Sequence, residues 1–161
     1  MDNVYAIDGI TPVVEPTAFV HPTAVVIGDV VIGKNCYVGP NVSLRGDLGQ
    51  IFMKNGSNMQ DGCIAHTFAG GQTVLEEFAN VGHGAVLHGC HLGKGVLIGM
   101  HALIMDEAEI GDFALVAALA LEKAKCVSLY NKEALVIGAD QLLDCQGIWL
   151  DKPKNKDDAI K

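Results

Sequence analysis

The stretch VHPTAVVIGDVVIGKNCYVGPNVSL, residues 20–44, repeats every six residues. One branched or long aliphatic residue opens each repeat, at Val20, Val26, Ile32, Val38 and Leu44. Four places after each comes a small or aliphatic residue: Ala24, Val30, Cys36, Val42 and Leu48. The period returns at Leu92, Ile98, Ile104, Ile110 and Val116, with weaker repeats between the two blocks at Met53, Met59, Ala65, Val81 and Leu87.

A period of six fits neither a helix, whose period is 3.6, nor a plain amphipathic strand, whose period is 2. It fits short strands separated by turns, with one large and one small residue of each repeat pointing inward. Three such sides make a coil of about 18 residues, and successive coils stack at the strand spacing of about 4.8 Å. The sequence therefore predicts an all-β fold, a parallel β-helix of hexapeptide repeats.

The repeat also predicts how the chain is divided. It runs to about Lys125, so we assign residues 1–127 to the β-helix. Residues 67–80 break the phase and predict a loop that leaves one corner of a coil. Leucine and isoleucine then recur at roughly helical spacing, which predicts a C-terminal helical segment over residues 128–150. Residues 151–161 read as a charged, frayed tail.

Composition excludes several classes of partner. The formal net charge of −8 argues against nucleic acid, which needs a basic surface. No apolar run approaches the about 20 residues that span a bilayer, and the first residues lack the pattern of a signal peptide. Five cysteines without a CxxC pair suit reduced thiols. We therefore expect a soluble, cytoplasmic protein that binds neither membrane nor nucleic acid.

Three histidines lie near turns of the central coils: His66, His83 and His88. Three imidazoles with an open fourth position form the ligand set of a catalytic zinc, although iron or cobalt could occupy the same site. His83 and His88 are five residues apart, a reach of up to roughly 17 Å in extended chain, so we expect them on different sides of the coil. A neighbouring subunit is then the natural source of the third ligand, and a triangular prism packs readily as a homotrimer.

Three segments carry a family resemblance: SLRGD at 43–47, NMQDGCIAH at 58–66 and VGHGAVLHGCHLG at 81–93. Together they resemble the γ-class carbonic anhydrase family, in the branch that includes the phenylacetic acid degradation and carnitine operon proteins. The resemblance runs from about Tyr5 to Lys125. It implies a left-handed β-helix, a C-terminal helix and a homotrimer with zinc at each interface. It also implies that His66 and His88 come from one chain and His83 from the next.

The resemblance implies roles for further residues. Arg45 and Asp47 match the family's Arg-x-Asp pair, which holds the interface near bicarbonate; a purely structural ion pair is the alternative. Gln60 and Asp61 match its Gln-Asp pair, in which the glutamine orients the metal-bound water or bicarbonate. Leu48 stands where well-studied members carry an acidic proton shuttle. Glu76 and Glu77 lie in the replacement loop, with nothing in the sequence to place them near the metal.

The resemblance thus implies zinc-dependent hydration of carbon dioxide to bicarbonate. Three alternatives stay open. One is an acyl-CoA thioesterase that uses the same activated water. Another is a hexapeptide acyltransferase, which would use histidine as a general base. The last is a catalytically weak structural trimer, which the missing shuttle residue favours.

Overall fold

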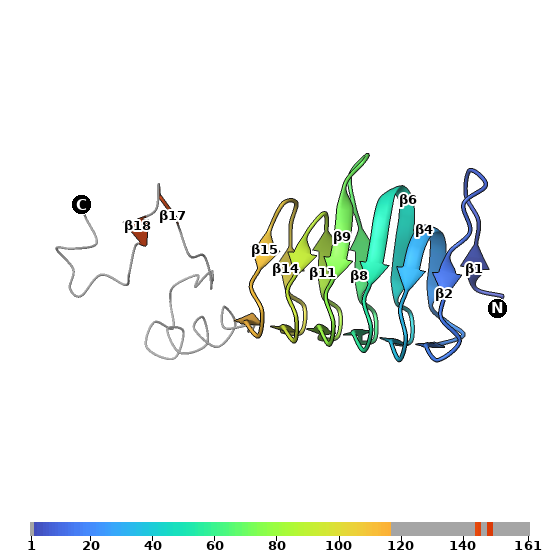
Figure 1. Ribbon diagram of the computed structural model, residues 1–161, viewed down its shortest axis with the longest axis horizontal. Coiled ribbons are helices and arrows are strands. Elements are labelled where there is room, and N and C mark those ends of the chain that lie inside the picture. The colour runs from blue at the N-terminus through green and yellow to red at the C-terminus, as the bar shows by residue number, and fades with distance from the viewer. Residues whose placement is uncertain (1, 117–143, 146–147, 150–161) are drawn as a thin grey trace, which may run out of the picture. The chain divides into compact units, whose positions relative to one another are not determined.

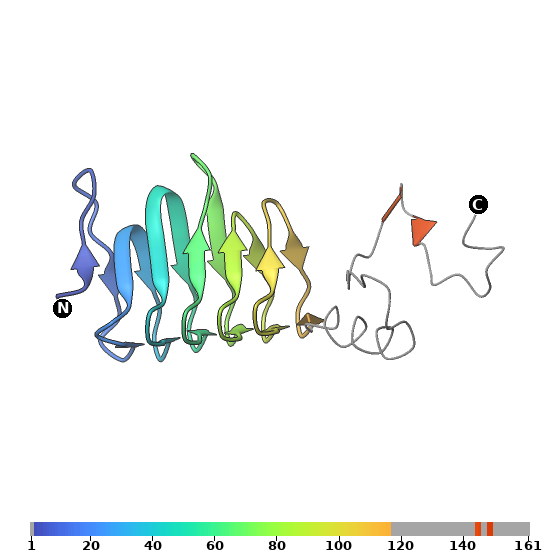
Figure 2. The same ribbon diagram turned by 180° about the vertical axis from the view of Figure 1, so that it is seen from behind.

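The computed structural model describes residues 2–116, 144–145 and 148–149. The chain divides into two compact units, Met1–Ala118 and Leu119–Lys161, which we describe separately. In the first unit every pairing between named strands is parallel, and the strands stack coil upon coil along one axis (Figures 1 and 2). This is the predicted parallel β-helix.

The coils have three faces. The first face contains β1 (Val4–Tyr5), β8 (Ile64–His66), β11 (Val86–His88) and β14 (Leu103–Ile104). The second contains β2 (Val13–Val14), β9 (Gln72–Leu75), β12 (His91–Leu92) and β15 (Glu109–Ile110). Two long strands, β4 (Val25–Ile32) and β6 (Ser43–Met53), turn the corner between these faces. The third face contains β3 (Phe19–Val20), β5 (Tyr37–Val38), β7 (Asn58–Met59), β10 (Asn80–Val81), β13 (Leu97–Ile98) and β16 (Leu115–Val116).

The predicted inward residues form one apolar core. Positions that open a repeat, such as Ile32, Leu44 and Ile98, are almost fully buried. Small residues such as Ala24 and Cys36 are buried beside them, since a coil is too narrow to take a large residue at every inward position. The core thins toward the last coils, where Ile110 and Val116 are only partly buried.

The inward position predicted for Leu48 is wrong, because this side chain is exposed. Val26 pairs with Leu44, 18 residues later, whereas Val30 pairs with Ile51, 21 residues later. Three extra residues therefore enter the corner of this coil, and Ile51 takes the inward place that strict six-residue counting gives to Leu48. The loop predicted within 67–80 is confined to residues 67–71, after which β9 resumes the coil.

The predicted helix over 128–150 lies mostly outside the described residues. The four that are described form two short antiparallel strands, β17 (Asp144–Cys145) and β18 (Ile148–Trp149), so this part is not helical. The charged tail, 151–161, lies outside the described residues altogether. Among the residues that are described, no helix has the length and apolar character needed to cross a membrane.

Candidate metal centre

His66 and His88 lie side by side on the first face. They end β8 and β11, and they are register partners in this parallel pair. The two rings therefore lie on neighbouring strands with their centroids 5.1 Å apart, and their planes are tilted by 58° to each other. His66 Nδ1 lies 3.2 Å from His88 Nε2, so one nitrogen of each ring faces the other ring.

The outward nitrogen of each ring is held by a carboxylate. His66 Nε2 bonds Asp47 Oδ1 at 2.8 Å, and His88 Nδ1 bonds Asp106 Oδ1. The second oxygen of Asp47 accepts a hydrogen bond from Arg45 at 2.7 Å. Partial burial raises the pKa of Asp47, but the hydrogen bonds from His66 and Arg45 outweigh it, so this pKa lies below its ordinary value. Asp47 is thus an anion that orients His66.

The two inward nitrogens form a suitable pair of ligands for a cation. When the N–H of each imidazole donates its hydrogen bond to the carboxylate, two lone pairs face each other across 3.2 Å, and a proton or a metal ion between them relieves the repulsion. Two nitrogens bound at about 2.0–2.1 Å to one tetrahedral zinc are about 3.3 Å apart. A carboxylate behind a histidine is also the usual outer partner of a zinc ligand. His66 and His88 therefore fit zinc as two of its ligands.

His83 lies elsewhere in the chain, at the corner that leads from the third face to the first. Its Nδ1 is 3.6 Å from Asp61 Oδ2, and both side chains are at least half exposed. Gln60, at the same corner, donates from its amide nitrogen to Asn80 Oδ1 at 3.2 Å. In the part of the chain that the structure describes, no three His, Cys, Asp or Glu side chains are grouped to hold a metal.

The seven residues predicted for the site consequently form two groups at different corners of one chain. The first group contains Arg45, Asp47, His66 and His88, and the second contains Gln60, Asp61 and His83.

Sequence reasoning missed Asp106, although a signal was present. Asp106 follows His88 by 18 residues, which is one full coil, and stacking at that spacing brings the two side chains together. Gly89 makes room for this contact, because a β-carbon there would lie 2.7 Å from Asp106 Oδ1. Its φ of +58° is also one that glycine adopts without strain.

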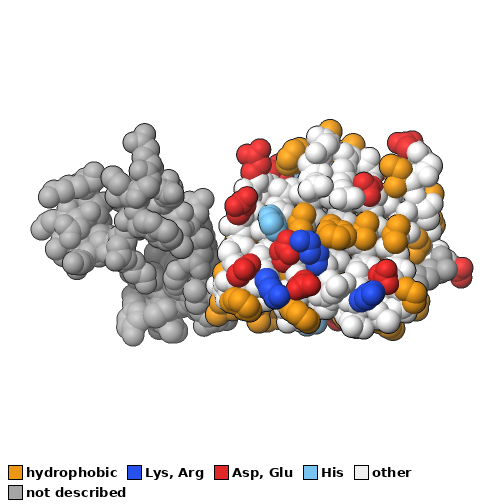
Figure 3. Space-filling model, viewed as in Figure 1, with side chains coloured by type: hydrophobic (Ala, Val, Ile, Leu, Met, Phe, Trp, Pro, Cys, Tyr) orange, Lys and Arg blue, Asp and Glu red, His pale blue; other side chains and the backbone are white. Residues whose placement is uncertain are grey.

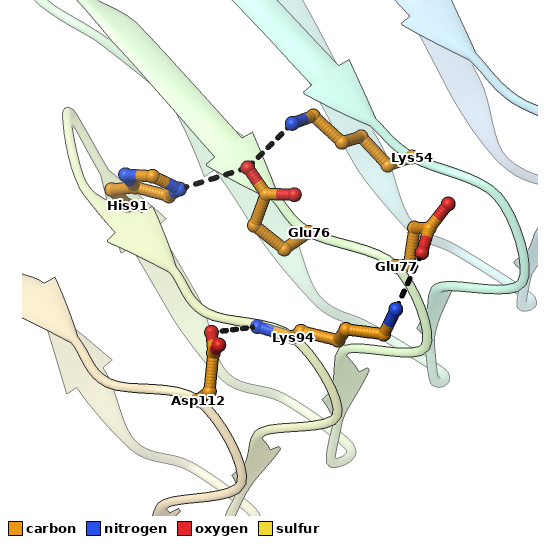
Figure 4. Close-up of polar contacts among 6 residues, drawn as sticks. All are labelled: Lys54, Glu76, Glu77, His91, Lys94 and Asp112. Carbon is orange, nitrogen blue, oxygen red and sulfur yellow. Dashed lines mark hydrogen bonds and ion pairs between the residues drawn. The ribbon is translucent and has the colours of Figure 1, made fainter.

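Glu76 and Glu77 belong to a charged network on the second face, which Figure 4 draws, and Figure 3 shows acidic and basic side chains gathered on one side of the coils. Glu76 accepts hydrogen bonds from Lys54 at 2.5 Å and His91 at 3.1 Å, and Glu77 pairs with Lys94 at 2.8 Å. The Lys54 hydrogen bond is the main cause that lowers the pKa of Glu76. The hollow of about 540 Å³ that Glu76, Glu77, His91 and Lys94 help to line includes neither His66 nor His88. The network therefore joins side chains of neighbouring coils and is separate from the imidazole pair.

Comparison with known proteins agrees with this fold. Residues 11–46 match the family model "Bacterial transferase hexapeptide (six repeats)", and residues 97–161 match the model "Maf-like protein". The chain is 52% identical over 122 residues to the carnitine operon protein CaiE of Escherichia coli K12, and 48% identical to that of Proteus sp. LE138. Each match covers 76% of this chain, which spans only 62% of the relative's own length.

Solved structures agree as well. A hexapeptide transferase family protein from Anaplasma phagocytophilum superimposes with a TM-score of 0.69 at 37% identity, covering 71% of this chain and 68% of that one. A putative acetyltransferase from Bacillus cereus gives 0.63 at 25% identity, covering 70% and 76%. The coil stack is accordingly the left-handed β-helix of such proteins. With its six-residue repeat built into successive coils and this degree of identity to a solved member, the chain belongs to the hexapeptide-repeat transferase family.

Proposed function

We propose that this protein is a metal-dependent enzyme of the γ-class carbonic anhydrase type, which hydrates carbon dioxide at the subunit interfaces of a homotrimer. One observation carries the proposal. The inward nitrogens of His66 and His88 lie 3.2 Å apart, while a carboxylate holds the outward nitrogen of each ring. That arrangement pre-orients two ligands for one cation, and a general-base histidine of an acyltransferase does not need a second imidazole beside it.

Each residue near the pair has an assigned task. Asp47 and Asp106 fix the tautomers of the two rings by accepting hydrogen bonds from their outer N–H groups. Arg45 pairs with Asp47, and its guanidinium would lie near the place where a bicarbonate anion forms. When bound, a zinc ion supplies a water whose pKa is close to 7, and this water is the nucleophile that hydration requires.

On this proposal, the second group of residues, Gln60, Asp61 and His83, is contributed to the metal site by the neighbouring subunit. His83 is half exposed at a corner of the coil, where it can reach a neighbour. A threefold assembly places the same two corners together at every interface, so His83 of one chain would complete the His66–His88 pair of the next. Asp61 orients His83, and Gln60, beside it, is assigned to orienting the reacting water.

Two specific observations support other functions. The solved relatives carry the titles hexapeptide transferase and putative acetyltransferase, which favours acyl transfer. The exposed Leu48 offers no proton acceptor one residue from Asp47, which favours weak hydration or a structural role. A thioesterase acting on acyl-CoA would use the same activated water as carbon dioxide hydration.

One set of variants separates these functions. We expect purified protein to carry about one zinc per chain and to hydrate carbon dioxide, and His88→Ala to lose both properties. His21→Ala serves as the matched control, because the His21 imidazole hydrogen-bonds to the neighbouring Thr23 and lies outside both groups of site residues. Wild-type protein that takes up no metal would contradict the proposal. Acetyl transfer from acetyl-CoA that survives His88→Ala would instead support the acyltransferase, and thioester cleavage lost with the metal would support the thioesterase.

A further inference from the structure

One buried hydroxyl connects the backbones that carry the two imidazoles. Thr73 lies in β9 with its side chain fully buried. Its Oγ1 donates to the carbonyl oxygen of His66 at 2.6 Å and accepts from the amide of Gly89 at 2.9 Å. Gly89 directly follows His88, so one side chain holds the residue that ends β8 and the residue that follows β11.

The hydrogen bonds form a closed triangle. The Gly89 amide also donates directly to the His66 carbonyl, at 3.2 Å, and this is longer than either bond to Thr73. Without the hydroxyl, this long contact would be the direct link between the His66 carbonyl and the Gly89 amide, at the point where the paired strands end and the chain turns into a corner. The Thr73 hydroxyl therefore contributes the two shorter sides of the triangle.

Packing alone does not explain a threonine at this place. Thr73 occupies an inward column in which its register partner one coil earlier is Ile51, and Val30 pairs with Ile51 in turn. Both of these are fully or almost fully buried apolar residues. A valine has the shape of threonine and would suit such a column, whereas a hydroxyl is costly there unless it is hydrogen-bonded.

We propose that Thr73 is a positioning residue, which sets the separation of His66 and His88 by tying the His66 carbonyl to the Gly89 amide. The proposal rests on the function proposed above, because the separation of the two imidazoles matters when both bind one metal ion. The Thr73 hydroxyl hydrogen-bonds to backbone atoms rather than to either imidazole, and it would act through the two backbones.

The test compares three variants of the full chain. Thr73→Val removes the hydroxyl and keeps the shape, Thr73→Ser keeps the hydroxyl, and Ser57→Ala removes a buried hydroxyl away from the pair. Two quantities are measured: Co²⁺ affinity by titration of its visible absorption, and the hydrogen-exchange rate of the Gly89 amide in metal-free protein. If Thr73→Val does not fold, Thr73→Ala takes its place, since it also lacks the hydroxyl.

We expect Thr73→Val to weaken Co²⁺ binding by about 10-fold, as is typical when an outer partner of a metal ligand is lost. Exchange of the Gly89 amide should become at least about 10-fold faster, because its shorter hydrogen bond is gone. Thr73→Ser should restore both values, and Ser57→Ala should change neither.

Unchanged Co²⁺ affinity in the valine variant would overturn the proposal while leaving the metal site itself intact. Failure of Thr73→Ser to restore the affinity would also overturn it. A wild-type protein that binds no Co²⁺ would instead refute the proposed function. In that case the hydrogen-exchange rate of the Gly89 amide would still test whether Thr73 holds the two backbones together. An unchanged exchange rate in the valine variant would overturn this role of Thr73.

Discussion

Replacing Gly46 with alanine should reduce the stability of the coil stack and, on the function proposed above, the affinity of the protein for a metal ion. Gly46 lies in β6 between Arg45 and Asp47. A β-carbon there would be 2.4 Å from the carbonyl oxygen of Asp29 and 2.6 Å from its carbonyl carbon, whereas ordinary contact begins at 3.4 Å. Both neighbouring atoms are backbone, so the strands must separate by about 1 Å. Overpacking of this kind costs about 1–3 kcal/mol of unfolding free energy.

The same displacement reaches the candidate metal centre. Asp47 is the next residue, and its Oδ1 is 2.8 Å from His66 Nε2. A shift of about 1 Å lengthens this contact beyond hydrogen-bonding distance. His66 then loses the carboxylate that orients it, and Co²⁺ affinity should fall by about 10-fold or more.

The assay measures denaturant unfolding and Co²⁺ titration on Gly46→Ala and on Gly111→Ala. Gly111 is the matched control, because a β-carbon there would meet no atom within 4 Å. Its variant should stay within about 0.5 kcal/mol of the parent protein and should bind Co²⁺ equally well. A Gly46→Ala protein with the parent's stability and affinity would refute the steric argument and the link from Asp47 to His66.

Three further outcomes are expected. His66→Ala and His83→Ala should each bind little metal, but trimers refolded from an equal mixture of the two variants should regain about a quarter of their metal sites. A random interface brings the two intact halves of a site together with probability one-half times one-half. Trimers that regain no sites would mean that the whole site lies within one chain. Hydration by a protein with Leu48 at the shuttle position should accelerate when imidazole buffer is added at constant pH, and a fast rate indifferent to buffer would point to a shuttle within the protein. Burial raises the pKa of Cys90 to about 11. Iodoacetamide at pH 8 should therefore leave this thiol unmodified in the native protein and alkylate it after unfolding, which peptide mass mapping would record. Equal labelling in both states would contradict the burial of Cys90.

The fold could be predicted because the six-residue period equals the number of residues on one side of a coil. A residue such as Ile32 or Leu44 must face inward when every sixth position begins a new side of the coil, and both are buried. Counting failed at Leu48 because a corner can take extra residues without disturbing the strands on either side. Corner length depends on local turn geometry, which leaves no periodic trace in the sequence.

The candidate site could be predicted only where the number of residues between two side chains equals one full coil. His66 and His88 are 22 residues apart, one coil of 18 plus a loop, and resemblance rather than spacing paired them. Asp106, by contrast, was accessible to counting, since one coil separates it from His88. The hydrogen bonds of Thr73 were not, because they depend on how the chain turns after β8 and β11.

The spacing of the coils explains why such a site would be shared between chains. Neighbouring strands are about 4.8 Å apart, so two side chains stacked on them can bring one nitrogen each to within 3.2 Å. A third ligand in the same column would start about 9.6 Å from the first, too far for ligands that must lie about 3.3 Å from each other. His83 of the same chain is at another corner, paired with Asp61. On the proposed assignment, metal binding and trimer formation are therefore one linked equilibrium, and each group that fixes His66 against His88 also sets how well the partner's His83 completes the site.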